Sequence, residues 1–257
     1  MDNLFKAKYS QRKGGDIIMK RLGLFFLVAA CVLVAAVAFA GIANTKHNLS
    51  TSGPGTQIQN ASVCGPCHIP HGGQTGGVAP LWARKTPTSN YSLYGNGKTL
   101  SNTNVTSPGT HSLTCLSCHD GSIAINTITK NGVDTTIGNV TNNTAYVNSS
   151  GYIVSVANSA YQALIGTDLT NDHPVGVVYN SGAQYAGLTN SLTNQGSYYT
   201  PTGTNWRIYG GGDNSGKVEC GSCHDPHTEN NSGHSGETNK FLRGSVANIC
   251  QDCHANK

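Results

Sequence analysis

The sequence has 257 residues and a formal net charge of +4. Six of its 16 basic and two of its 12 acidic residues lie in the first 40 positions, so residues 41–257 carry ten of each sign. A neutral chain offers no positive surface to a phosphate backbone, which argues against nucleic-acid binding. Leu, Ile, Val and Phe supply 36 of these 217 residues, a fraction too small for an ordinary core, so another apolar group must contribute.

Residues 1–40 contain a segment typical of a secretory signal. A charged start and an apolar run lead to the small-x-small cleavage site Ala38–Ala40. We expect translation to begin at Met19 and cleavage to follow Ala40, which leaves no membrane span in the mature chain. The alternatives are a membrane anchor and a lipoprotein attached at Cys31, although further apolar residues follow that cysteine. In each case the chain crosses the inner membrane.

Every cysteine after position 40 falls in a C-x-x-C-H motif, the attachment motif of c-type haem. Two thiols at this spacing reach the two vinyl groups on one porphyrin edge, and the adjacent histidine reaches the iron as proximal ligand. Disulfides or a zinc ribbon would need no histidine after every pair. We therefore predict four covalent haems. The attachment cysteines are Cys64, Cys67, Cys115, Cys118, Cys220, Cys223, Cys250 and Cys253. The proximal ligands are His68, His119, His224 and His254.

The remaining histidines repeat in order along the chain. One histidine precedes a C-x-x-C-H-x-P-H motif at 64–71 and another precedes the copy at 220–227, and a plain motif follows each copy. Both methionines lie in the signal region, so methionine ligation is excluded. The candidate distal ligands are His47, His71, His173 and His227. His111 and His234 are left over, and either could replace a predicted ligand.

The second histidine of each C-x-x-C-H-x-P-H motif cannot serve the iron of its own motif. A distal ligand lies on the opposite porphyrin face, and three residues cannot pass around the ring. Pro70 and Pro226 also end any helix that carries the motif, because the residue before a proline avoids helical geometry. His71 and His227 are therefore expected to bind the iron of a neighbouring haem.

The motifs divide the mature chain into three parts. Residues 41–120 form an N-terminal dihaem half, 121–172 a haem-free insert rich in Thr, Asn, Ser and Gly, and 173–257 a C-terminal dihaem half. The insert contains β-compatible runs such as Tyr152–Val156 and is predicted to form loops or a hairpin. We expect a mostly irregular fold with short helices at the haem motifs and little β-structure, organised around a stacked haem chain.

The sequence also resembles a family. GIANTKHNLS at 41–50, CGPCHIPH, PLW, CLSCHDGS, DHPVGVVY at 172–179 and CGSCHDPH are together similar to the tetrahaem extracellular cytochromes of the OmcE type. The resemblance implies histidine ligation on both faces of every haem, haem stacking that continues between subunits, and polymerisation into conductive filaments. It also implies that one ligand can come from the next subunit, for which His47 is the candidate because it lies near the mature N-terminus.

These observations favour an electron carrier over an enzyme. Iron with two histidine ligands is closed to exogenous substrates, and the histidine supply is sufficient for every iron. We expect a secreted, extracellular or cell-surface homopolymer that exchanges electrons with other redox proteins or extracellular acceptors. The first alternative is a soluble periplasmic shuttle with the same haems. The second is a multihaem reductase of the nitrite or hydroxylamine type, which needs one open iron.

Overall fold

The computed structural model describes residues 41–74, 79–94, 105–142, 145–158, 162–179, 192–211, 215–227 and 241–254. The chain divides into two units, Met1–Gly41 and Ile42–Lys257, and the second contains all the sequence motifs discussed below. The expected signal segment at 1–40 and the leftover His234 lie outside the described residues. Among the described residues, no helix combines the length and apolar character needed to span a membrane.

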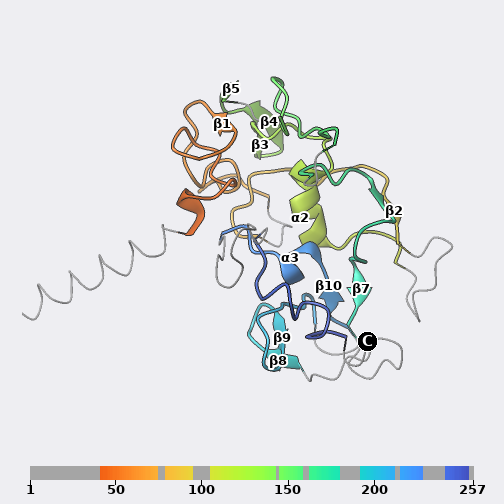
Figure 1. Cartoon of the computed structure of the whole chain (residues 1–257). Helices are drawn as coiled ribbons and strands as arrows, with labels where there is room; N and C mark the ends of the chain where they lie inside the picture. Colours follow the sequence, from red (N-terminus) through yellow and green to blue (C-terminus); the bar gives the residue numbers. More distant parts are fainter. Residues whose placement is uncertain are drawn as a thin grey trace, which may run out of the picture. The chain divides into compact units, whose positions relative to one another are not determined.

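Regular structure is sparse, which confirms the predicted irregular fold (Figure 1). The helices described are α2 (Thr110–His119) and α3 (Cys220–Cys223). The strands are β1 (Gln57–Ile58), β2 (Ser92–Leu93), β3 (Thr127–Lys130), β4 (Val133–Thr136), β5 (Val140–Thr141), β6 (Asp168–Leu169), β7 (Val177–Val178), β8 (Leu192–Asn194), β9 (Tyr199–Pro201) and β10 (Lys217–Val218). Both helices carry a C-x-x-C-H motif, so the cysteines are presented on rigid backbone.

The other two motifs form single helical turns instead of named helices. The histidine N–H donates to the carbonyl of the first cysteine over 2.8 Å (His68 to Cys64), 2.6 Å (His254 to Cys250) and, at the end of α3, 3.0 Å (His224 to Cys220). One such hydrogen bond closes one turn and places the two thiols on one side of it. In the first motif Pro66 has no N–H to extend the turn.

Helix α2 is bounded by glycines. Gly109 is its N-cap and has no side chain to satisfy the first N–H groups of the helix. At the other end, Gly121 adopts φ +75°, and its N–H donates to Cys118 O at 3.1 Å. This left-handed residue is a common way to end a helix. The motif histidine His119 is thus the last residue of α2.

The strands form two-stranded pairs. β3 and β4 make a hairpin within the insert, and their turn is Asn131-Gly132, where φ is +51° and +80°. β1 pairs antiparallel with β5 and β2 pairs parallel with β6, which joins the first half of the chain to the insert. β7 pairs with β10, and β8 with β9, in the last third of the chain. The insert is therefore attached to the N-terminal half along two strand pairs.

The described core consists of three small clusters. One surrounds Ile58, Ile125, Val147 and Ile153; a second contains Leu93, Leu116 and Leu169; a third contains Tyr179 and Ile208. Motif cysteines Cys118 and Cys253 pack against the first and third clusters respectively. Two of the three clusters therefore contact a motif cysteine.

Candidate haem-binding centre

The eight motif cysteines are free thiols and not disulfides. Thiols of successive motifs lie close together in chain order, pairing Cys67 with Cys118, Cys115 with Cys220, and Cys223 with Cys253. Burial, and then the charge of the neighbouring motif's thiol, raise the pKa of Cys67 and of Cys253 to about 12 in each case. The thiols therefore form a continuous series from the first motif to the last.

Three of the four proximal histidines each face a predicted distal histidine. The ring centroids are 6.1 Å apart for His47 and His119, 6.2 Å for His68 and His227, and 6.4 Å for His173 and His254. The angles between the ring planes are 77°, 23° and 58° in the same order. The pair His68–His227 joins the two dihaem halves of the chain. Each of the other two pairs joins opposite ends of one half.

The spacing of these pairs fits an iron atom between the rings. A bond from imidazole nitrogen to a first-row metal is about 2.0 Å long, and the ring centroid lies about 1.1 Å beyond the nitrogen. Two imidazoles on opposite sides of one metal therefore have centroids about 6.3 Å apart. The observed 6.1–6.4 Å agrees with this value. Contacting aromatic rings span about 4.5–7 Å between centroids, so the separations are compatible with one iron in each pair.

Several of these histidines are oriented through Nδ1. The Nδ1–H of His68 donates to Pro80 O and that of His119 to Ala163 O, both at 2.7 Å. His173 donates to the adjacent Pro174 O at 3.1 Å. A hydrogen bond at Nδ1 fixes the tautomer in which Nε2 is free to bind metal, as is usual for histidine ligands. The side chains are thus held in the form that ligation requires.

His227 differs because its Nδ1 faces a carboxylate. Its Nδ1–H donates to Asp225 Oδ1 at 3.2 Å, and Arg243 donates to Asp225 Oδ2 at 2.8 Å. The hydrogen bond from His227, together with the charge of Arg243, holds the pKa of Asp225 well below its usual range. Asp225 is therefore a carboxylate held between an arginine and a candidate ligand.

His47 is half-buried within its own chain. Its ring lies 4.3 Å from the Phe241 ring and 6.1 Å from that of His119. Its Nδ1 is buried without a hydrogen-bond partner in the part of the chain that the structure describes. Burial, and then the charge of His119, lower the pKa of His47 to about 3, so it stays neutral, as a metal ligand must be. The structure thus places His47 beside His119 of the same chain.

The other histidines take separate positions. His71 is exposed. His224 lies close enough to His47 and His119 for its charge to lower the pKa of both. His111 stacks on Tyr209 with ring centroids 3.7 Å apart, too close for a metal between them. The structure therefore brings together three of the predicted distal histidines with proximal ones and leaves His71 at the surface.

The repeat seen in the sequence extends to the backbone after each C-x-x-C-H-x-P-H motif. Ile69 N–H donates to Leu81 O at 2.9 Å, and Asp225 N–H to Phe241 O at 2.7 Å. Two residues further on, each copy makes a second backbone hydrogen bond of 2.8 Å, to the carbonyl of the motif's second cysteine. The donor is the N–H of Ala83 in the first copy and of Arg243 in the second. Leu81 and Phe241 both have positive φ, +57° and +63°. Sequence reasoning missed this part because the returning segments share no residues.

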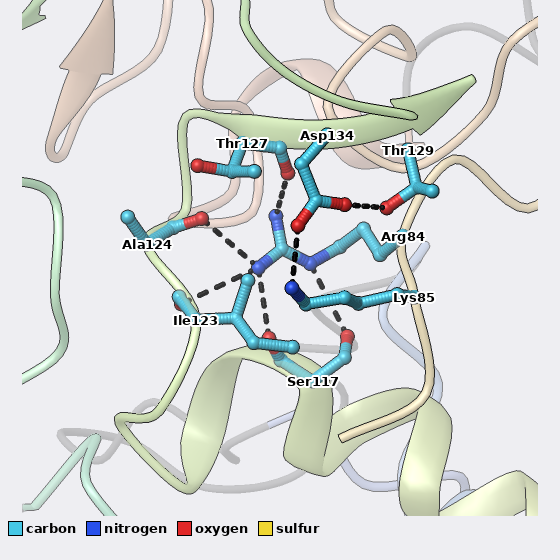
Figure 2. A network of polar contacts seen from close by, with 8 residues as sticks. All are labelled: Arg84, Lys85, Ser117, Ile123, Ala124, Thr127, Thr129 and Asp134. Atoms are coloured by element: carbon cyan, nitrogen blue, oxygen red, sulfur yellow. Dashed lines mark hydrogen bonds and ion pairs between the residues drawn. The ribbon is translucent and has the colours of Figure 1, made fainter. Parts of the chain in front are cut away.

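Arg84 lies in the segment that follows the first motif, and its side chain forms hydrogen bonds with the second motif and the residues after it (Figure 2). Its side chain is 1% exposed, and the hydrogen-bond partners it has among the described residues are oxygens of neutral groups. The partners are Ser117 Oγ (3.2 Å), Ser117 O (2.8 Å), Ile123 O (3.4 Å), Ala124 O (3.1 Å), Ile125 O (3.1 Å) and Thr127 O (2.9 Å). Beside it, Lys85 pairs with Asp134, which also accepts from Thr129 at 2.8 Å. Sequence alone gave no sign of this buried cation.

Glu219 connects the two helices that carry haem motifs. It is 3% exposed and is the N-cap of α3, where it exchanges hydrogen bonds with Ser222 as a capping box. The same carboxylate accepts from the N–H and hydroxyl of Ser112, in the first turn of α2. Cys220 N–H donates to the Ser112 hydroxyl at 3.1 Å. One carboxylate thus satisfies donors at the start of both helices.

Comparison with known families supports the assignment of haem-binding motifs in the C-terminal part of the chain. Residues 214–257 match a family model described as "Doubled CXXCH motif". The search of curated proteins gave no match to the chain. The matched region contains two complete C-x-x-C-H motifs, each of the kind that attaches haem through two thioether bonds. These features support a multihaem c-type cytochrome involved in electron transfer.

Proposed function

We propose that the chain is a tetrahaem electron relay in which histidines bind both faces of each iron. The observation that carries this proposal is the 6.1–6.4 Å separation of three histidine pairs, each combining a motif histidine with a predicted distal one. Bound haem supplies one-electron chemistry between ferric and ferrous iron. The protein's own part is to orient the imidazoles through hydrogen bonds at Nδ1.

The order of the thiols supports a single path for electrons. Neighbouring motifs bring their thiols together in the order first, second, third and fourth. Thioether bonds at these cysteines would attach each haem close to the attachment site of the next. Because electron tunnelling falls steeply with distance, the relay depends on these short steps. The path would therefore follow the order of the motifs in the sequence.

Ferric-state spectroscopy tests the relay against the reductase. Two histidines per iron give low-spin ferric haem, whereas a reductase needs one open position and shows a high-spin population. We expect four covalent haems by mass spectrometry and a wholly low-spin electron paramagnetic resonance spectrum. One high-spin haem in four, at full haem loading, would overturn the relay in favour of the enzyme.

We further propose that the chain polymerises into an extracellular filament. The resemblance to OmcE-type cytochromes supports this, as does the zero formal net charge of residues 41–257, which gives little repulsion between copies. His71 is exposed and so is better placed than His47 to reach the iron of another copy. A contact that repeats head to tail without closing produces a filament.

Electron microscopy of the purified protein and of cell-surface material separates a filament from a periplasmic shuttle. We expect filaments in both samples. His71→Ala should shorten or abolish them, while His111→Ala, which removes a stacked and non-ligating histidine, should leave them unchanged. A monodisperse monomer recovered from the periplasm with all four haems would favour the shuttle.

A further inference from the structure

We propose that Asp225, held by Arg243, lowers the reduction potential of one particular haem, the one that His68 and His227 would bind. This inference rests on the proposed function, since it takes His227 to be an axial ligand. Asp225 acts through His227 and is therefore a positioning and tuning residue. Neither the motif nor the histidine pattern assigns it a role, because the x of H-x-P-H can be any residue.

The hydrogen bond at Nδ1 distinguishes this ligand from the others. His68, His119 and His173 donate to backbone carbonyls, which are neutral, whereas His227 donates to a carboxylate. A carboxylate acceptor draws the proton from Nδ1 and makes the imidazole a stronger electron donor at Nε2. Stronger donation stabilises ferric over ferrous iron, so the potential falls.

Arg243 offsets the charge of Asp225 only in part. It contacts Oδ2 at 2.8 Å, while Oδ1 faces His227, so the negative charge is nearer to the imidazole than the positive charge is. Arg243 is itself fixed by a second hydrogen bond of 2.8 Å from Nε to Gly221 O. The arginine therefore keeps the carboxylate in place against His227, which an unsupported aspartate on a turn would not achieve.

The first copy of the motif provides a natural control. Its backbone makes the same hydrogen bonds, but Ile69 stands where the second copy has Asp225, and Ala83 where it has Arg243. The two copies thus present the same fold with and without the carboxylate and its arginine. We infer that the two copies give different properties to the haems that their second histidines bind.

The test is a spectroelectrochemical titration of the haem-loaded protein, comparing Asp225→Asn with the native chain. The measured couple is the addition of one electron to iron, with both axial bonds kept. Asparagine preserves the shape and leaves a neutral acceptor, as in the other ligands. We expect one of the four reduction potentials to rise by at least about 59 mV, which for a one-electron couple is a tenfold change in the ferric-to-ferrous ratio. The other three potentials should stay unchanged. Four unchanged potentials, or four equal shifts, overturn the proposal.

Removing the arginine's charge asks the question in reverse, and still answers it if Asp225→Asn does not take up haem. Arg243→Gln keeps the Asp225 carboxylate beside His227 and a donor for Oδ2 but removes the positive charge that offsets it, so the potential that Asp225→Asn raises should fall. An unchanged potential in a fully loaded Arg243→Gln variant counts against the proposal.

His227→Ala separates this proposal from the one it rests on. Loss of the ligand should convert one haem to high spin. If His227→Ala leaves all haems low-spin, the ligand assignment itself is wrong. If it creates a high-spin haem while Asp225→Asn shifts no potential, the tuning role of Asp225 alone is wrong.

Discussion

Ser112 and Glu219 lie 107 positions apart in the sequence, yet the Ser112 N–H donates to Glu219 Oε2 at 3.3 Å and the Ser112 hydroxyl donates to the same oxygen. This contact joins the start of α2, which carries the second motif, to the start of α3, which carries the third. It therefore lies where the two halves of the proposed relay meet.

Glu219→Ala should destabilise the native protein more than Glu219→Gln does. Alanine leaves buried donors of Ser112 and Ser222 without an acceptor, at a cost of about 1–3 kcal/mol in the free energy of unfolding. Glutamine retains a carbonyl oxygen at the same place. Denaturant unfolding of the haem-loaded variants measures the difference, with haem content checked by mass. Equal losses in both variants would show that the carboxylate does not bridge the helices.

The stability of this contact should depend on pH. Burial raises the pKa of Glu219 above 4.5, against hydrogen bonds from Ser112 that lower it. Between the unfolded and the folded pKa the native state binds more protons, so the free energy of unfolding falls as the pH rises through this interval. Glu219→Gln lacks this term. The stability of the Gln variant relative to the native chain should therefore increase from about pH 4 to pH 7, and a constant difference across that interval would contradict the pKa shift.

Gly109→Ala should disturb the same junction from the other side. A Cβ on Gly109 would lie 1.5 Å from Glu219 Oε1, so the carboxylate must move away from α2. We expect a loss of about 1–3 kcal/mol in the free energy of unfolding, typical of overpacking. Gly55→Ala is the control, because its Cβ would meet nothing closer than 3.9 Å. Similar losses at both positions would indicate a general effect of alanine.

The sequence predicted the irregular fold and the positions of the motifs, since both follow from local patterns. It also contains a specific hairpin signal within the insert. Asn131-Gly132 is the dipeptide preferred in two-residue turns with positive φ, and it joins β3 to β4. The β-compatible run Tyr152–Val156 instead forms one isolated bridge, between Val147 and Ile153. The turn residues were therefore a better guide than strand propensity.

Long-range polar contacts could not be predicted in the same way. Nothing near Arg84 in the sequence distinguishes it from a surface arginine, because its partners lie between 33 and 43 positions further along the chain. The contact between Ser112 and Glu219 likewise joins residues 107 positions apart. The haem motifs are defined by spacing within five residues, whereas these supports depend on how distant segments pack. Asp225 was visible in the sequence, but its effect required the position of His227.

Arg84→Lys should weaken the segment that follows the second motif. Lysine carries three donors on one nitrogen and cannot span carbonyls that lie on several sides of a planar guanidinium. Buried carbonyls would lose partners, and we expect the free energy of unfolding to fall by about 2–4 kcal/mol. The neighbouring Lys85→Ala is the matched control. Its ion pair with Asp134 is exposed, so the change should be within about 1 kcal/mol. Calorimetry of the haem-loaded proteins measures the free energy of unfolding of both variants. An equal loss in the two would show that Arg84 does not stabilise this segment.

The angles between paired imidazoles predict two distinct signals in electron paramagnetic resonance. Each imidazole donates π-electrons into the iron d orbital perpendicular to its plane. Rings at 23°, as for His68 and His227, raise the same orbital and should give a rhombic low-spin spectrum. Rings at 77°, as for His47 and His119, raise two orbitals almost equally and should give a highly anisotropic signal with one large g value.

Single substitutions assign these two signals to their histidines. His227→Ala should remove a rhombic component and His47→Ala the highly anisotropic one, with one high-spin haem appearing in each variant at unchanged haem content. His111→Ala should leave both signals, because His111 stacks on Tyr209 at 3.7 Å. If His47→Ala removes a rhombic component instead, the ring angle does not persist around the iron. If it removes neither, another residue binds the iron of His119.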